Sequence, residues 1–505
     1  MADPAVSDGP AGADRRRLIV LAAAALAVEI VYCYVISAGT FVHFPRNLTF
    51  LDDLAEGFRH GHLHLIVEPP AALLAQANPF DPANGRLWYW DASLYGGHYY
   101  LYWGPVPALL LAAVKVAFRI STVVGDQHVV FWLTTLQLLA GTLLVERAGR
   151  LLFERPPLTL EVAAIVALGC ANPTLYDLAR PAVYEAAIVG GQAFLLLGMV
   201  FAIDGVVADR PRPARFAAAG ASWIAAFGCR MSVGPAIALV VAVTLAGAVA
   251  GRSGRLRRLG VVTVALGAPL ALGFGAFLLY NHLRFGAWLD FGHRHQLTWI
   301  DLHVGPRFIA TNLYAYFRRP PIVNCRFPFA YAVQDLGARA FPPGYRFPEN
   351  YFVYEPVAGI LPMIPWSWLG PLAVVGAGRE SWRARTFSPR SWAVTATAVA
   401  AAAGLVPDLV LGTATNRYLG DVVGSVALLG AFGAFTAAGW LRARRRLRRA
   451  LSAVAVVLAV ETAALGFALG IKGQYAHFEA DNPPLYQKLV RALSVCRGPI
   501  PPEPK

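Results

Sequence analysis

Carboxylates that could take part in chemistry are concentrated in one stretch of the chain. Between residues 52 and 91 there are six of them: Asp52, Asp53, Glu56, Glu68, Asp81 and Asp91. Such a carboxylate can act as a general base on a hydroxyl group, or it can hold a divalent cation on a phosphate leaving group. The first three share one flank of a predicted helix whose other face is apolar. We expect that helix to present its acids to water.

Residues 88–105, WYWDASLYGGHYYLYWGP, surround Asp91 and His98 with eight aromatic side chains. Tyrosine and tryptophan rings stack on sugars, and they also favour the headgroup level of a membrane. We predict that Asp91 contributes to catalysis and that His98 helps to bind a phosphate group. Tyr95 and Tyr99 are predicted to contact substrate.

His60, His62 and His64 alternate along the chain just before this segment. On a strand they would line one face and could bind a metal ion. A histidine-rich interfacial loop explains the same pattern, and we assign no metal ligand here.

The composition is that of a membrane protein. Of the 505 residues 57% are hydrophobic and only 15% are charged, and the mean hydropathy is +0.50. Soluble proteins carry about 25% charged residues. Many apolar runs reach the roughly 20 residues that cross a bilayer as a helix. The sequence therefore predicts an all-α polytopic membrane protein.

The net charge of +14 comes mostly from short arginine-rich segments between the apolar runs. This distribution is typical of cytoplasmic loops and gives no support to nucleic-acid binding. The predominance of arginine and alanine over lysine indicates a GC-rich bacterial genome, so we expect a bacterial inner-membrane protein. The segments are Arg15–Arg17, Arg147–Arg155, Arg210–Arg215, Arg252–Arg258, Arg379–Arg390 and Arg442–Arg449.

Fixing these loops in the cytoplasm predicts about 11 spans. Residues 1–17 form a cytoplasmic tail, and residues 38–127 and 281–351 form two large periplasmic loops. Residues 441–505 hold the last span and a periplasmic tail, and Gly104–Ile120 is a juxtamembrane helix. The predicted spans are Leu18–Ser37, His128–Glu146, Leu158–Leu175, Val183–Val206, Phe216–Phe227, Val233–Val249, Val261–Tyr280, Val353–Val375, Trp392–Leu411, Leu419–Trp440 and Leu451–Leu469.

Three arginines lie at the outer ends of spans, where the distribution of positive charge does not account for them. They are Arg180, Arg230 and Arg417. The planar guanidinium suits a phosphate, but salt bridges to Glu185 or Asp421 would explain these arginines equally well. Three further residues are predicted to contact substrate: Tyr184, Arg284 and Tyr418.

The cysteines divide into two groups. Cys33, Cys170 and Cys229 fall in predicted spans, where we expect them to pack as small apolar residues. Cys325 and Cys496 fall in segments placed outside, where a disulfide is chemically allowed.

Four segments carry a resemblance to a known family. They read LAEGFRHGHLHL at 54–65, DASLYGGHYYLYWGPVPALL at 91–110, YNHLRFGAWLDFGHRHQL at 280–297 and RYLGD at 417–421. In these motifs the chain resembles the GT-C superfamily of integral-membrane glycosyltransferases, the group of protein O-mannosyltransferases and of the lipid A aminoarabinose transferase. The resemblance extends to about residue 440 and implies a GT-C-like transmembrane domain over residues 18–440.

This resemblance implies an inverting transfer of a sugar from a polyprenyl-phosphate donor to a glycan, lipid or protein acceptor on the periplasmic face. It also implies an essential acid soon after the first span, and a direct count of positions lands near Asn47. The nearest carboxylates make Asp53 the first candidate for the base, followed by Asp52, Glu56 and Asp91. Arg180, Arg230, Arg417 and His98 would hold the donor phosphate. The one cofactor that this chemistry invites is a divalent cation.

Two other functions are compatible with a polytopic chain. A flippase or transporter for a lipid-linked sugar would place charged residues deep in its spans, and few acids fall there, among them Glu29 and Asp204. An assembly subunit without activity would tolerate alanine at the outer-loop acids.

Overall fold

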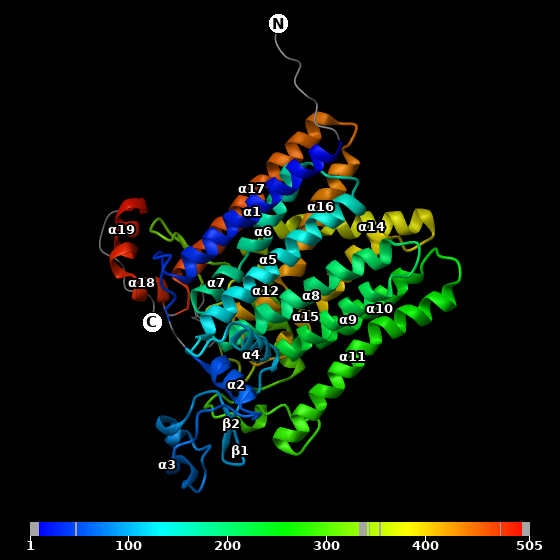
Figure 1. Ribbon diagram of the computed structural model, residues 1–505. Helices are drawn as coiled ribbons and strands as arrows, with labels where there is room; N and C mark the ends of the chain where they lie inside the picture. Colours follow the sequence, from blue (N-terminus) through cyan, green and yellow to red (C-terminus); the bar gives the residue numbers. More distant parts are fainter. Residues whose placement is uncertain are drawn as a thin grey trace.

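The structure is a computed structural model that describes residues 10–45, 48–332, 341–342, 344–352, 355–474 and 476–496. Across these ranges the chain is mostly helical and forms only two short hairpins of sheet. Long helices run side by side, and α2, α3 and the first hairpin gather at one end of the bundle (Figure 1). We call this the outer end. The predicted all-α polytopic fold is confirmed.

The helices have the following bounds. They are α1 (Pro10–Ile36), α2 (Phe50–Arg59), α3 (Ala71–Leu74), α4 (Val106–Phe118), α5 (Asp126–Leu151), α6 (Leu158–Cys170), α7 (Thr174–Ala179), α8 (Val183–Val207), α9 (Pro213–Cys229), α10 (Gly234–Val249), α11 (Arg255–Phe285), α12 (Ile309–Phe317), α13 (Ile360–Met363), α14 (Gly370–Ala384), α15 (Pro389–Leu409), α16 (Val423–Trp440), α17 (Arg445–Lys472), α18 (His477–Asp481) and α19 (Pro483–Leu493).

Eight helices in the described ranges are long and apolar enough to cross a membrane: α1, α5, α8, α10, α11, α15, α16 and α17. Two predicted spans coincide instead with the shorter helices α6 and α9. The prediction of one span over 353–375 was wrong in its bounds, because the apolar run is broken before Pro365 and α14 begins only at Gly370, with Pro371 in its first turn. Residues 353 and 354 lie outside the described ranges.

The arginine-rich loops meet at the end of the bundle opposite the outer loops. The Arg17 guanidinium donates to the Pro156 carbonyl at 2.7 Å, and Arg390 donates to Leu152 at 2.9 Å. Two further contacts of this kind are Arg258 with Ala208 and Arg442 with Glu154. Grouping these loops at one end is what the predicted topology requires; that this end faces the cytoplasm stays a prediction.

The first outer loop folds into a helix, α2, and a hairpin. Strands β1 (Ser93–Tyr95) and β2 (His98–Tyr100) pair antiparallel, with Ser93 opposite Tyr100. The turn uses Gly96 and Gly97 at φ 57° and 82°, a left-handed conformation that glycine adopts at little cost. A second hairpin, β3 (Ile322–Val323) with β4 (Ala330–Tyr331), lies in the second outer loop.

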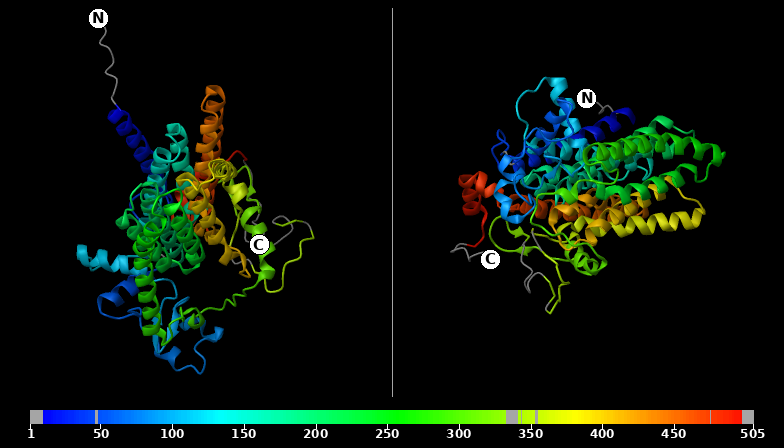
Figure 2. Two further views of the ribbon diagram at one scale, coloured as in Figure 1. Left: turned by 90° about the vertical axis from the view of Figure 1, so that its right-hand side faces the viewer. Right: turned by 90° about the horizontal axis from the view of Figure 1, so that it is seen from below.

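The acids of α2 do not face water as the sequence predicted. Asp52 is 2% exposed and Asp53 is 8% exposed, because α4 packs against this helix. The Lys115 ammonium of α4 lies 2.6 Å from Asp52 and 2.5 Å from Glu56. In Figure 2 α4 lies across the direction of the long helices, in agreement with a juxtamembrane position.

Lys115→Met should lower the free energy of unfolding by about 3–5 kcal/mol, because it leaves two neighbouring carboxylates without their cation. Thermal unfolding in detergent measures the effect. Adding Asp52→Asn and Glu56→Gln should restore most of the loss, and Lys488→Met on the surface of α19 should change little. Equal unfolding temperatures for Lys115→Met and Lys488→Met would contradict this role.

The two cysteines placed outside form a disulfide. Cys325 and Cys496 are joined with their Cα atoms 5.6 Å apart, and the Val495 amide donates to the Cys325 carbonyl at 2.9 Å. The bond ties the segment after α19 to the second outer loop. Disulfides persist in oxidising compartments, which agrees with a periplasmic outer end.

Alkylation of the unfolded but unreduced protein should leave Cys325 and Cys496 unmodified and give one joined peptide after proteolysis. Reduction should separate the two peptides and expose both thiols. Cys325→Ser should make Cys496 reactive without reduction. Recovery of both cysteines already alkylated before reduction would contradict the pairing.

Candidate active site

A cavity of about 470 Å³ lies at the outer end, where the first outer loop meets the ends of the helices. Asp91 enters it from the residues before β1, Arg180 from the end of α7, and Tyr184 from the first turn of α8. Arg230 follows α9, and η6 (Asn416–Asp421) supplies Arg417 and Tyr418. The remaining lining residues are Tyr102, Trp103, Ile188, His293, Gln296, Thr298, Trp299, Ile300, Leu302, Glu355, Thr413 and Thr415.

Asp91 is the carboxylate best placed to act as a base in this cavity. Its backbone is left-handed at φ 64°, a conformation that aspartate adopts more readily than bulkier residues. The carboxylate accepts hydrogen bonds from Gln296 Nε2 at 2.8 Å and from the Tyr184 hydroxyl. A carboxylate has about four acceptor positions. Asp91 is therefore oriented by two donors and can still accept a proton.

Arg230 forms a bidentate ion pair with Asp421. Its Nε lies 3.1 Å from Asp421 Oδ1, and its Nη2 lies 2.8 Å from Asp421 Oδ2. Asp421 also accepts from the Ser232 hydroxyl at 3.2 Å. These bonds do not use the two hydrogens on Nη1. The Arg230 guanidinium is therefore paired with Asp421 and can still donate to an anion through Nη1.

Arg417 lies between two buried carboxylates. It is 3.1 Å from Glu355 and 3.6 Å from Glu185, and its guanidinium carbon is 4.6 Å from the centre of the Tyr184 ring. Arg180 joins the same group, 3.6 Å from Glu355. The three arginines therefore form salt bridges and also line the cavity.

The cavity also holds a phenol that stays protonated. Burial, followed by the negative charge of Asp91, raises the pKa of Tyr102 well above its ordinary value. Its hydroxyl is therefore a hydrogen-bond donor throughout the physiological range. A carboxylate, three guanidiniums and this hydroxyl could bind a phosphate ester while a base removes a proton beside it.

Three solved structures of the oligosaccharyltransferase from Archaeoglobus fulgidus align with 89–90% of this chain. The apo form has a TM-score of 0.51 at 14% identity, and the complex with an inhibitory peptide and a dolichol-phosphate has 0.50 at 12%. The form tethered to an acceptor peptide with the NVT sequon has 0.52 at 12%. The chain shares the fold of these structures over most of its length.

The chain spans only 55–56% of the length of those oligosaccharyltransferase structures. No protein-family model matches its sequence. No curated protein matches it significantly either. The likeness therefore establishes the fold, and the chemistry has to be argued from the residues of this chain.

The three other candidate bases lie outside the cavity lining. Asp52 and Glu56 are bound by Lys115, and Asp53 accepts from Tyr89 at 2.7 Å and from Thr49 at 3.2 Å. Burial alone would raise the pKa of Glu56, but the bonds from Lys115 and Arg59 lower it below its usual value. Asn47, where the count of positions landed, lies outside the described residues.

Several predicted binding residues also lie elsewhere. Arg284 is buried at the end of α11, donates to the Leu101 carbonyl at 2.6 Å and stacks 3.8 Å from the centre of the Tyr280 ring. It therefore anchors the strand that leads to Tyr102. The cavity lining also does not include Tyr95, Tyr99 or His98.

Sequence reasoning missed Gln296, Glu355 and Trp299. Gln296 is part of the quoted motif at 280–297, so its signal was present but its role was not assigned. Glu355 follows the second outer loop as a lone acid among aromatic residues, and only the fold brings it to Arg417. Trp299 is 71% exposed at the edge of the cavity, where its ring is available to a sugar.

The cavity does not gather ligands for a metal ion in the way that the sequence allowed. In the described part of the chain, a single group of three or more His, Cys, Asp or Glu side chains converges closely enough, and it consists of His64, Glu68 and His98. None of the three lines the cavity. The positive charge beside Asp91 comes from arginine.

The pH dependence of stability should report on Asp53. Burial, reinforced by neighbouring Asp52 and opposed by the Tyr89 and Thr49 bonds, raises the pKa of Asp53. Its contribution to folding is then complete below the unfolded-state pKa and is lost as the pH rises through the higher folded-state value. Asp53→Asn should flatten this fall in unfolding temperature, whereas Asp81→Asn in the exposed loop should not. Parallel curves for the wild type and Asp53→Asn would contradict the assignment.

Proposed function

We propose that this protein is an inverting glycosyltransferase that moves a sugar from a polyprenyl-phosphate donor to an acceptor hydroxyl at the periplasmic face of a bacterial inner membrane. The observation that carries the proposal is that Asp91 and three arginines line one cavity, at the outer end of a GT-C-like fold. The acceptor is a glycan, a lipid or a protein.

An apolar cavity of about 540 Å³ next to this site supports a lipid-linked donor. The polar cavity is lined by Trp103 and Arg230. The apolar cavity is lined by Pro105 and Gly228, which lie two residues away from them in the sequence. A Cβ at Gly104 would lie 1.9 Å from the Gly228 carbonyl oxygen, so the two cavities flank this close backbone contact. The prenyl chain would lie on the apolar side and its phosphate on the arginine side.

The chemistry follows from this division. Asp91 takes the proton of the acceptor hydroxyl as its oxygen attacks the anomeric carbon of the donor. The bond from that carbon to the phosphate oxygen breaks, and polyprenyl phosphate leaves with the negative charge. Arg180, Arg230 and Arg417 stabilise that charge, which is the part of such a transition state where preoriented donors are most effective.

Two further observations agree with this proposal. One of the A. fulgidus structures holds a dolichol-phosphate together with an inhibitory peptide, so a lipid phosphate and a peptide are both bound by a protein of this fold. The disulfide in the outer segments and the arginine-rich loops at the opposite end support a periplasmic cavity.

The geometry favours Asp91 over Asp53 as the base, although the sequence ranked Asp53 first. Asp91 lines the cavity, whereas Asp53 is fixed by Tyr89 and Thr49 in the packing of α2. Asp52 and Glu56 would have to leave a buried lysine to reach a substrate. We therefore assign a structural role to Asp52 and Glu56.

Asp91→Asn should lower the release of polyprenyl phosphate from polyprenyl-phosphate sugars by about 10²–10⁴-fold, the usual contribution of a general base. The assay uses the purified chain in detergent with candidate acceptors. Asp81→Asn, an exposed acid of the same loop, is the matched control. The double variant Asp52→Asn with Asp53→Asn should keep its turnover per folded molecule.

Full activity of Asp91→Asn together with loss in the double variant would return the role of base to Asp53 or Asp52. If the wild type releases no polyprenyl phosphate with any donor but moves lipid-linked sugar across vesicles, the protein is a flippase and the transferase proposal fails.

A further inference from the structure

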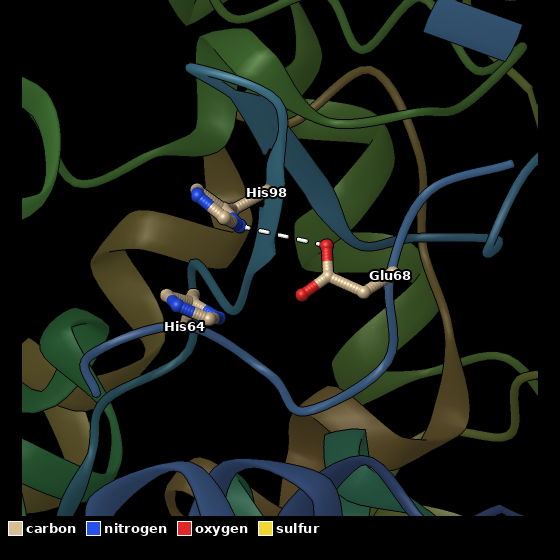
Figure 3. A group of neighbouring side chains, drawn as sticks. All are labelled: His64, Glu68 and His98. Carbon is tan, nitrogen blue, oxygen red and sulfur yellow. Dashed lines mark ion pairs between the residues drawn. The ribbon is translucent and has the colours of Figure 1, made fainter. Parts of the chain in front are cut away.

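Three potential metal ligands converge in the first outer loop, away from the active-site cavity. His64 and Glu68 lie in the segment between α2 and α3, and His98 begins β2 (Figure 3). One ligand atom from each side chain lies within 4.8 Å of the other two. The Glu68 carboxylate is 3.7 Å from His98 Nδ1.

The two imidazoles are prepared for such a role. His64 Nδ1 lies 2.7 Å from the Leu65 carbonyl oxygen, so a proton on Nδ1 is donated there and the Nε2 lone pair stays available. Metal-binding histidines usually fix their tautomer with a second contact of this kind. His98 Nδ1 is buried and makes no hydrogen bond within the described residues.

His62, His64 and His98 form a stack of imidazole rings. The rings of His64 and His98 stack with their centres 4.2 Å apart and their planes 15° from parallel, and the His62 ring stacks on His64 at 4.8 Å. Two imidazole nitrogens and one carboxylate oxygen are a donor set that suits a divalent transition-metal cation.

Backbone contacts hold the two segments together without help from the side chains. The Leu65 amide donates to the Tyr99 carbonyl at 2.9 Å, and the Ile66 amide donates to the backbone carbonyl of Asp53 at 3.2 Å. A Cβ at Gly57 would lie 2.2 Å from the His64 carbonyl oxygen, so α2 also presses against this segment. The segments that carry His64 and His98 are therefore adjacent before any ion binds, and the two side chains would turn out of their stack to direct both nitrogen lone pairs at one ion.

We propose that His64, Glu68 and His98 form a zinc-type site, with two nitrogen ligands, one carboxylate and water in the fourth position. Nitrogen donors favour Zn²⁺ or Co²⁺ over Mg²⁺ or Ca²⁺, which prefer oxygen. Tetrahedral bonds of about 2.0–2.1 Å require ligand atoms roughly 3.3 Å apart, so the ligands must close by about an ångström. Glu68 is 67% exposed and can make this movement.

The ion would link the segment that follows α2 to the first hairpin, close to the turn between β1 and β2. Tyr95 and His98 pair beside that turn, and Asp91 lies just before the other end of β1. A metal at this position stabilises the hairpin that carries Asp91 into the cavity, without taking part in the reaction. The site involves Glu68 and His98 in place of His60 and His62, because residues 60–68 form a loop and not a strand.

Metal titration of the purified full-length chain tests the site independently of transferase activity. The protein carries an affinity tag without histidine, is stripped with a chelator and is titrated with Co²⁺, whose visible absorption reports tetrahedral coordination. We expect one Co²⁺ per chain, displaced by Zn²⁺. Glu68→Gln and His98→Gln should each weaken binding by at least about 100-fold, since loss of a contact behind a ligand alone costs 10–100-fold.

His60→Gln and His62→Gln are the matched controls and should bind as the wild type does. Glu68→Gln changes an exposed side chain, so its folding is secure, and unfolding temperatures check the other variants. Zn²⁺ should raise the unfolding temperature of the wild type and of both controls but not of Glu68→Gln. Absence of Co²⁺ binding at micromolar concentration, or binding unaffected by Glu68→Gln and His98→Gln, would overturn the proposal.

Discussion

Charge at the end of an apolar bundle must be paired, and this constraint organises the outer end of the molecule. Removing the carboxylate from a buried ion pair with arginine is strongly destabilising. Arg230 binds Asp421, which joins the residue after α9 to η6, and Arg417 binds Glu355, which joins η6 to the residues after the second outer loop. Arg180 donates to Gln474 at 2.6 Å and so joins α7 to the end of α17. The pairs therefore bring together segments that are distant in the sequence.

The same pairing explains how the cavity can be both rigid and able to bind an anion. Arg230 is fixed by Asp421 through Nε and Nη2 and keeps the hydrogens on Nη1 for an anion, because a guanidinium has five donors in a planar arrangement. Donors that are already oriented need no reorganisation when charge develops on a leaving phosphate. A lysine in these positions would offer one charge without that division of its two sides.

The first outer loop separates roles among acids that look alike in the sequence. Lys115 neutralises Asp52 and Glu56 in the contact between α2 and α4, and Tyr89 and Thr49 hold Asp53. Only Asp91 lies in the cavity, oriented by Tyr184 and Gln296. The hairpin that follows Asp91 carries His98 at its other end, so one small element connects the active-site acid to the proposed metal site.

The sequence by itself determined the membrane class, the arginine-rich end of the bundle and the helix at residues 50–59, and it allowed a disulfide between Cys325 and Cys496. These features depend on local composition and on patterns of apolar and charged residues. It also marked Arg180, Arg230 and Arg417 as unusual, because arginine is rare at the outer ends of spans.

Tertiary structure alone decided which acid of the first outer loop shares a cavity with these arginines. Asp53 and Asp91 are both carboxylates of that loop near aromatic residues, and they differ in the neighbours that other segments give them. Glu355 and Gln296 reach the cavity through the packing of the second outer loop, and His98 meets Glu68 through the hairpin. Contacts between distant segments leave no periodic pattern in a single sequence, and for that reason the site had to be found in the folded chain.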